Sequence, residues 1–167
     1  LSKCVKYNVE MPKLCITQKN ITIPGSGQQV EVLTPFFFKQ DFDFSEVFSL
    51  IADLKSTSGK VSVVEFSVHT DSSDTDINFI DTLQASIGSD TLEAPPPLLV
   101  ANYRRPIVKV DKNIISMIPD STQNVLSLMT AGNNFVQIGF TGLTPLVNTV
   151  INVTMCLQVD ISAHKSI

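Results

Sequence analysis

The chain has 167 residues, of which 43% are hydrophobic and 17% are charged, and it carries a formal net charge of −4. This length fits one domain, residues 1–167, and the scarcity of charge beside abundant apolar residues excludes an intrinsically disordered protein. An acidic net charge also excludes the overall basic field with which proteins hold nucleic acid, so no nucleic-acid partner is expected.

The composition also bears on membrane insertion and on the class of fold. No apolar run reaches the roughly 18 residues that a membrane-spanning helix needs, so no transmembrane segment is expected. The first residues show no basic region followed by an apolar stretch, so we expect no signal peptide, as in a mature secreted chain. Val, Ile, Thr and Phe are abundant whereas Ala and Glu are scarce, which favours strands.

Short segments with apolar residues at alternate positions predict β-strands along the whole chain. In chain order the expected strands are residues 4–9, 14–23, 28–33, 60–69, 77–88, 98–103, 107–110, 134–141 and 147–161. Two further segments have the apolar spacing of short helices, namely 45–55 after the N-cap candidate Ser45 and 119–131 before the C-cap candidate Gly132.

About eight to ten short strands with regularly spaced turns indicate an all-β fold, an antiparallel β-sandwich of the jelly-roll or immunoglobulin-like kind. Half of the ten phenylalanines lie between Phe36 and Phe44. We interpret this cluster as filling of the sheet's core, and the alternative is an exposed adhesive patch.

The expected strand at residues 147–161 is longer than strands usually are. Its odd-numbered positions are apolar except for Thr149, which indicates one buried and one wet face. An end that overhangs its own sheet could add to the sheet edge of a neighbouring molecule. The alternative is a long central strand whose hydrogen-bonding groups all pair within its own domain.

The three cysteines, Cys4, Cys15 and Cys156, match no metal-binding or redox spacing. Cys4 and Cys15 flank a turn candidate at residues 10–13, so a hairpin there predicts a disulfide between them, and this bond would indicate an extracellular or cell-surface location. The alternative is three buried thiols. Two glycosylation sequons begin at Asn20 and Asn152, and each is an acceptor only in a secreted protein.

Catalytic groups are scarce in the sequence. His69 and His164 are the side chains that could act as a base near neutral pH, and no nucleophile motif accompanies them. We therefore predict that the protein is not an enzyme. No cofactor is expected except calcium, for which Asp71, Asp74 and Asp76 form an oxygen-rich loop without the spacing of an EF-hand, and the alternative is a solvated loop.

The charges are unevenly distributed along the chain. Residues 61–103 hold seven acidic residues and no Lys or Arg, and Arg104, Arg105, Lys109 and Lys112 follow directly. Such an acidic pole and basic pole would favour head-to-tail association of copies of the chain. The exposed platform that Tyr103, Arg104 and Arg105 could form is a candidate glycan-binding site.

These observations predict a non-enzymatic extracellular or surface β-sandwich with a structural or adhesive role. Its expected partner is itself or another surface protein, as in a self-associating subunit of a surface assembly. The alternative is a module that binds a glycan or another small ligand.

Overall fold

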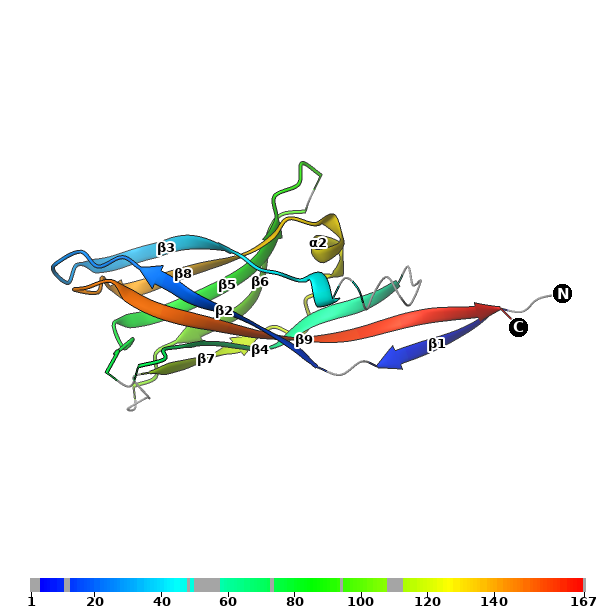
Figure 1. Ribbon diagram of the computed structural model, residues 1–167, viewed down its shortest axis with the longest axis horizontal. Helices are drawn as coiled ribbons and strands as arrows, with labels where there is room; N and C mark the ends of the chain where they lie inside the picture. The colour runs from blue at the N-terminus through cyan, green and yellow to red at the C-terminus, as the bar shows by residue number, and fades with distance from the viewer. Residues whose placement is uncertain are drawn as a thin grey trace.

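The computed structural model (Figure 1) describes residues 4–10, 13–47, 49, 58–72, 74–93, 95–107 and 113–166, with the backbone alone for 4–10, 36, 58 and 161–166. In chain order these ranges form β1 (Cys4–Glu10), β2 (Leu14–Ile23), β3 (Glu31–Asp41), β4 (Ser58–His69), β5 (Ile80–Ser89), β6 (Leu98–Arg104), β7 (Ile114–Pro119), α2 (Leu126–Ala131), β8 (Asn134–Leu143) and β9 (Thr149–Ser166). No helix among the described residues is both long and apolar enough to cross a membrane.

The strands form one antiparallel sheet in the order β1-β9-β4-β7-β6-β5-β8-β3, and β2 also pairs with β9. The sheet curls around its core as a half-barrel (Figure 1). The predicted all-β, antiparallel fold is thus confirmed, whereas its division into the two separate sheets of a sandwich is not. Both β1 and β2 pair with β9 over successive parts of its length, while β4 pairs with β9 along its other edge.

The inner face of the curled sheet carries the hydrophobic core, to which β9 contributes the longest row of side chains. Every second residue of β9 from Ile151 to Val159 is buried, as the alternation in the sequence predicted. The same core contains apolar side chains of β5 and β8, namely Leu83, Ala85, Ile87, Val136, Ile138 and Phe140. The end of β9, residues 160–166, pairs with β1 of the same chain. One edge of this overhanging part therefore pairs within the chain.

The phenylalanine cluster divides between the core and the outer face. Phe42 and Phe44 are buried, and Phe38 packs against the core, which confirms core filling for these three residues. Phe37 is 51% exposed, and its ring covers Gly139 of the neighbouring strand on the outer face. The side chain of Phe36 lies outside the described residues.

The helical segments differ from the prediction at their beginnings. A helical turn begins at Ser45, whose N–H donates to Asp43 Oδ1 (2.9 Å), so Asp43 provides the capping oxygen and the expected cap Ser45 does not. Residues 48 and 50–57 lie outside the described residues. Helix α2 is shorter than expected because the chain first turns at Asp120, but Gly132 ends it with the expected positive φ of 80°.

Because consecutive strands from β2 to β9 run in opposite directions, four connecting loops lie at the same end of the half-barrel. We call this the four-loop end and define it by the residues of four loops: 24–30, 70–72 with 74–79, 105–107 with 113, and 144–148. Figure 1 shows the β2–β3 and β8–β9 connections side by side there. Arg105 therefore shares one end of the molecule with Asp71, Asp74 and Asp76, from which it is distant in sequence.

Candidate functional site

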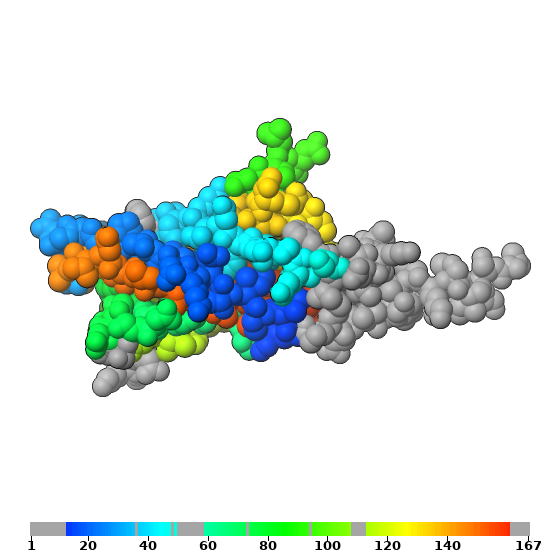
Figure 2. Space-filling model, in the orientation of Figure 1, coloured from blue at the N-terminus to red at the C-terminus, as the bar shows by residue number. Residues whose placement is uncertain are grey.

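The β2–β3 and β8–β9 loops form the first ridge of the four-loop end. The N–H groups of Ser26 and Gly27 donate to the carbonyls of Pro145 and Leu146, both at 3.0 Å. The hydroxyl of Thr144 accepts from the N–H of Val30 at 2.9 Å. These six residues join the two loops across more than one hundred positions of sequence, and Figure 2 shows the two loops in contact, so we expect the ridge to be rigid.

The second ridge consists of the β4–β5 loop and the residues that flank the β6–β7 connection. The amide nitrogen of Asn113 donates to the carbonyls of Ser72 (3.0 Å) and Thr75 (2.8 Å). The guanidinium of Arg105 donates to the carbonyl of Asn78 and pairs with the carboxylate of Asp81. One amide and one guanidinium therefore fix the shape of this acidic loop.

A cleft of about 360 Å³ lies between the two ridges. The first ridge contributes apolar side chains, of which Val147 is 72% and Leu146 55% exposed. The second ridge contributes Asp74 and Asp76. The remaining lining residues are Gln29, Thr75, Phe79, Pro145, Asn148, Thr149 and Val150.

This lining combines an apolar wall, carboxylate and amide groups, and one aromatic side chain. Ligand sites commonly have a few polar groups on a mostly apolar surface, and this volume lies at the lower end of their range. The carboxylates favour a ligand group that is cationic or donates hydrogen bonds, while Leu146 and Val147 favour an apolar body.

The loop proposed for calcium has other interactions. Asp71 Oδ1 accepts from the side-chain amide of Asn152 (2.9 Å), and Asp76 Oδ1 accepts from the N–H of Asn78 (2.8 Å). Within the described ranges, the acidic residues Asp71, Asp74 and Asp76 do not form a group of three ligands within 4.8 Å of one another. Calcium binding by this loop stays a prediction.

The glycan platform expected from Tyr103, Arg104 and Arg105 is not formed as one surface. Successive residues of a strand point to opposite faces, and the ring of Tyr103 packs against the core. Burial raises the pKa of its hydroxyl, with Asp81 adding to the shift and Arg105 opposing it. Arg104 is exposed, and Arg105 belongs to the second ridge.

The two sequons differ in access. Asn152 is only 1% exposed; its amide nitrogen donates to Asp71, and its oxygen accepts from the N–H of Asn20 (3.0 Å). A glycan on this nitrogen is incompatible with the fold. Asn20 is exposed at a bulge of β2, where its positive φ of 61° turns the chain, so its sequon is accessible.

The predicted Cys4–Cys15 disulfide is wrong, because Cys15 is bonded to Cys156. No hairpin joins β1 to β2; both strands pair with β9, so that Cys4 lies opposite Ser166 and Cys15 opposite Cys156. The Cα atoms of the bonded pair are 4.0 Å apart. The one available signal was that Cys156 stands among the polar, outward positions of β9 rather than in its apolar row.

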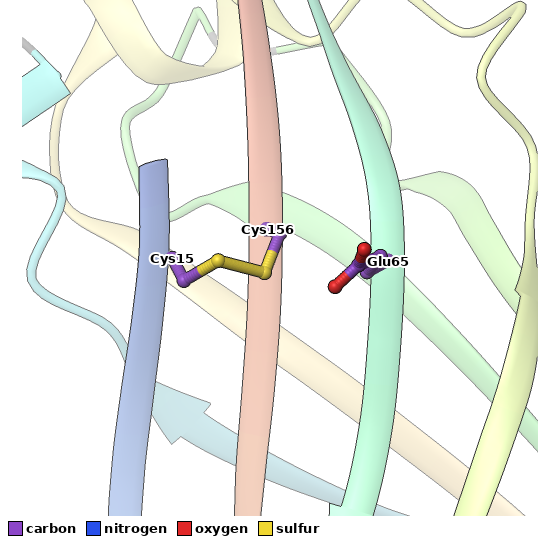
Figure 3. A group of neighbouring side chains, drawn as sticks. All are labelled: Cys15, Glu65 and Cys156. Atoms are coloured by element: carbon purple, nitrogen blue, oxygen red, sulfur yellow. A yellow bond between two sulfur atoms is a disulfide. The ribbon is translucent and has the colours of Figure 1, made fainter. Parts of the chain in front are cut away.

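A carboxylate lies beside this disulfide on the outer face of the sheet. Figure 3 shows Glu65 pointing from β4 toward the pair formed by Cys15 of β2 and Cys156 of β9. The Nζ of Lys13 is 2.6 Å from Oε1 of Glu65. Sequence reasoning missed this group because its members come from three distant segments of the chain.

The chain matches no known protein-family model, and no curated protein is significantly similar to it in sequence.

Proposed function

We propose that the protein is a non-enzymatic extracellular domain with an adhesive role, and that the four-loop end makes the contact. The observation that carries this proposal is the set of exposed apolar side chains on the first ridge, Val30, Leu146 and Val147, which hydrogen bonds hold beside an acidic cleft. Loops on a rigid sheet are common binding surfaces, and clustered exposed apolar side chains mark contact sites.

The disulfide supports the extracellular part of the proposal. Such bonds persist mainly in oxidising compartments, and this one joins strands from opposite ends of the chain, Cys15 and Cys156.

The partner that we propose is a second copy of the chain. Both signs of charge occur here, because Asp74 and Asp76 line the cleft of the four-loop end and the exposed Arg104 lies directly beside that end, as the last residue of β6. A two-fold rotation brings such a surface onto itself, so that apolar ridge meets apolar ridge and opposite charges can pair. The proposed assembly is therefore end to end.

Light scattering at rising concentration, with and without calcium, tests this assembly. We expect the double variant Leu146→Ser, Val147→Ser to shift the association to at least tenfold higher concentration. The matched control is Leu92→Ser, because Leu92 is fully exposed in the β5–β6 loop at the opposite end. A strict monomer at all concentrations contradicts the proposal, as does a double variant that associates like the control.

The cleft supports a second candidate function, the binding of a glycan or another small polar ligand. Its specific support is the set of Asp74, Asp76, Asn148 and Gln29 around one cavity, since carboxylates and amides provide directional hydrogen bonds. A glycan array with the unmodified protein is the test. Asp74→Ala should then remove binding, whereas Glu93→Ala, an exposed acid in the β5–β6 loop, should retain it.

A further inference from the structure

Three potential metal ligands form one row across the outer face of the sheet. In the register of the strands, Cys15 of β2 lies opposite Cys156 of β9, and Glu65 of β4 lies opposite Cys156 on its other side. The two sulfurs and a carboxylate oxygen lie within 4.8 Å of one another. Figure 3 shows that Glu65 points toward the sulfur atoms.

A β-bulge in β4 places the carboxylate in this row. Val63 pairs with Leu157 and Glu65 with Cys156, so Val64 is the additional residue between them. The bulge changes which face the odd-numbered residues occupy: Val63 is buried, whereas Glu65 is exposed. Bulges commonly redirect a side chain in this way next to functional sites.

We propose that reduction of the Cys15–Cys156 disulfide converts this row into a binding site for a thiophilic divalent metal ion, with zinc as the natural example. The ligands are the two thiolates and the carboxylate of Glu65, and solvent completes the tetrahedron. Zinc accepts such sets of sulfur and oxygen ligands, and three protein ligands with one open position is an established arrangement. This site is separate from the four-loop end and does not depend on the function proposed for it.

The reaction requires a two-electron reductant, and small thiols are the natural class. Two reductant thiols transfer two electrons and two protons to the S–S bond, giving the thiols of Cys15 and Cys156 and one disulfide of the reductant. The metal ion then displaces the two thiol protons and binds the thiolates. The sulfurs must separate from bonding distance to about 3.8 Å, the span set by Zn–S bonds of about 2.3 Å at a tetrahedral angle.

The charges around the row fit a bound dication. Two thiolates and one carboxylate carry three negative charges, and a divalent ion leaves one of them uncompensated. The ammonium of Lys13, at 2.6 Å from Oε1 of Glu65, neutralises that last charge. The pair of hydroxyls formed by Thr17 and Thr154 (2.9 Å) borders the row on the same face.

Cobalt(II) is the probe for the test, because tetrahedral thiolate ligation gives it visible d–d bands and a sulfur-to-metal charge-transfer band. The chain of residues 1–167 is reduced with a phosphine, which does not supply competing thiols, and titrated with cobalt and then with zinc. We expect one equivalent of cobalt per reduced chain, displacement by zinc, and no cobalt bands with the oxidised chain. Calcium should not displace the cobalt.

Variants identify the ligands. The double variant Cys15→Ser, Cys156→Ser should abolish the charge-transfer band, and Glu65→Gln should weaken cobalt binding at least tenfold. Glu31→Gln is the matched control, because Glu31 is also an exposed strand glutamate but lies in β3. Binding by Glu65→Gln that equals binding by Glu31→Gln overturns the assignment of the carboxylate.

The stability of the reduced chain must be followed in parallel. Circular dichroism and thermal unfolding of the reduced protein should show a higher midpoint with zinc than without it, since the metal binds the folded chain. If reduction unfolds the domain, zinc should restore the β-sheet spectrum. Absence of cobalt binding together with no stabilisation by zinc overturns the proposal.

Discussion

At Gly142 the fold requires glycine, because a side chain there would meet the backbone of a neighbouring segment. It lies in β8 and pairs with Ile80 of β5, directly beside the register shift between Ile80 and Thr82. Its φ is 140°. A Cβ atom there would stand 2.0 Å from the carbonyl oxygen of Phe79, which is backbone and cannot rotate away. We expect Gly142→Ala to lower the free energy of unfolding by about 3 kcal/mol, through backbone strain and the clash.

Gly27 provides the matched control for this substitution. It also has a positive φ, 75°, but no atom lies within 4 Å of the position of its Cβ. Gly27→Ala should therefore cost only the left-handed conformation, about 1 kcal/mol. Denaturant unfolding of both variants is the measurement, and equal losses would contradict the role given to the Phe79 carbonyl.

Asp120 provides a pH-dependent contribution at the turn between β7 and α2. Hydrogen bonds from the hydroxyl and the N–H of Thr122, and from the side chain of Gln123, lower the pKa of its carboxyl. Because the folded pKa lies below the unfolded one, the stabilisation is complete above the unfolded pKa and is lost as the pH falls through the folded value.

Asp120→Asn should therefore flatten the decrease in stability on acidification. Thermal midpoints measured from neutral pH down to strongly acidic pH give the comparison, with Glu93→Gln, an exposed acid in the β5–β6 loop, as the control. A variant whose midpoint falls with acid as steeply as that of the original chain would contradict the role of Asp120.

At the scale of elements, sequence alternation predicted those strands that have one apolar, buried face, but the other face is not wet throughout, because Asn152 and Cys156 of β9 are also buried. The bounds of β2 match the predicted segment 14–23, and β9 covers the predicted 147–161 except for its first two residues, which belong to the preceding loop. β7 was missed because its outward residues Ile114 and Ile118 are apolar like its inward ones, which hides the alternation. The strand expected at 107–110 lies mostly outside the described residues.

Pairing between strands was the part that the sequence could not predict. The neighbouring segments 4–9 and 14–23 suggested a hairpin. Instead, each of these two strands pairs with a different part of the long strand β9. The same long-range pairing determines the disulfide and the position of Glu65, neither of which has a local signal. The candidate site at the four-loop end likewise depends on this topology, although its acidic loop was recognised.

The Cys15–Cys156 bond yields a prediction for the edge strand β2, which it joins to β9. Non-reducing peptide mapping should give a cross-linked peptide with these two cysteines, and a peptide linking Cys4 to Cys15 would contradict the structure. Reduction should lower the stability by up to about 5 kcal/mol, the chain-entropy value for the observed separation of 141 residues. Denaturant unfolding with and without a phosphine measures this loss.

Across the whole molecule, the acidic segment 61–103 does not form an uncompensated pole. Three of its acids, Glu65, Asp81 and Asp90, pair with the cations Lys13, Arg105 and Lys39 respectively. Exposed pairs like these contribute only about 0–1 kcal/mol each to stability, but they neutralise the segment's charge at three places. Lys109 and Lys112 of the expected basic pole lie outside the described residues.

This charge distribution leads to a prediction for how salt affects self-association. Attraction between opposite poles would weaken as the Debye length falls from about 10 Å at 0.1 M salt to about 3 Å at 1 M. Contact through the apolar ridge of Leu146 and Val147 should instead persist, and sulfate should strengthen it, since excluded salts favour apolar burial. Light scattering at fixed protein concentration across this salt range measures the difference. Dissociation on raising sodium chloride would show that attraction between charges, and not the ridge, carries the contact, because the side chains of the ridge have no charge that salt could screen.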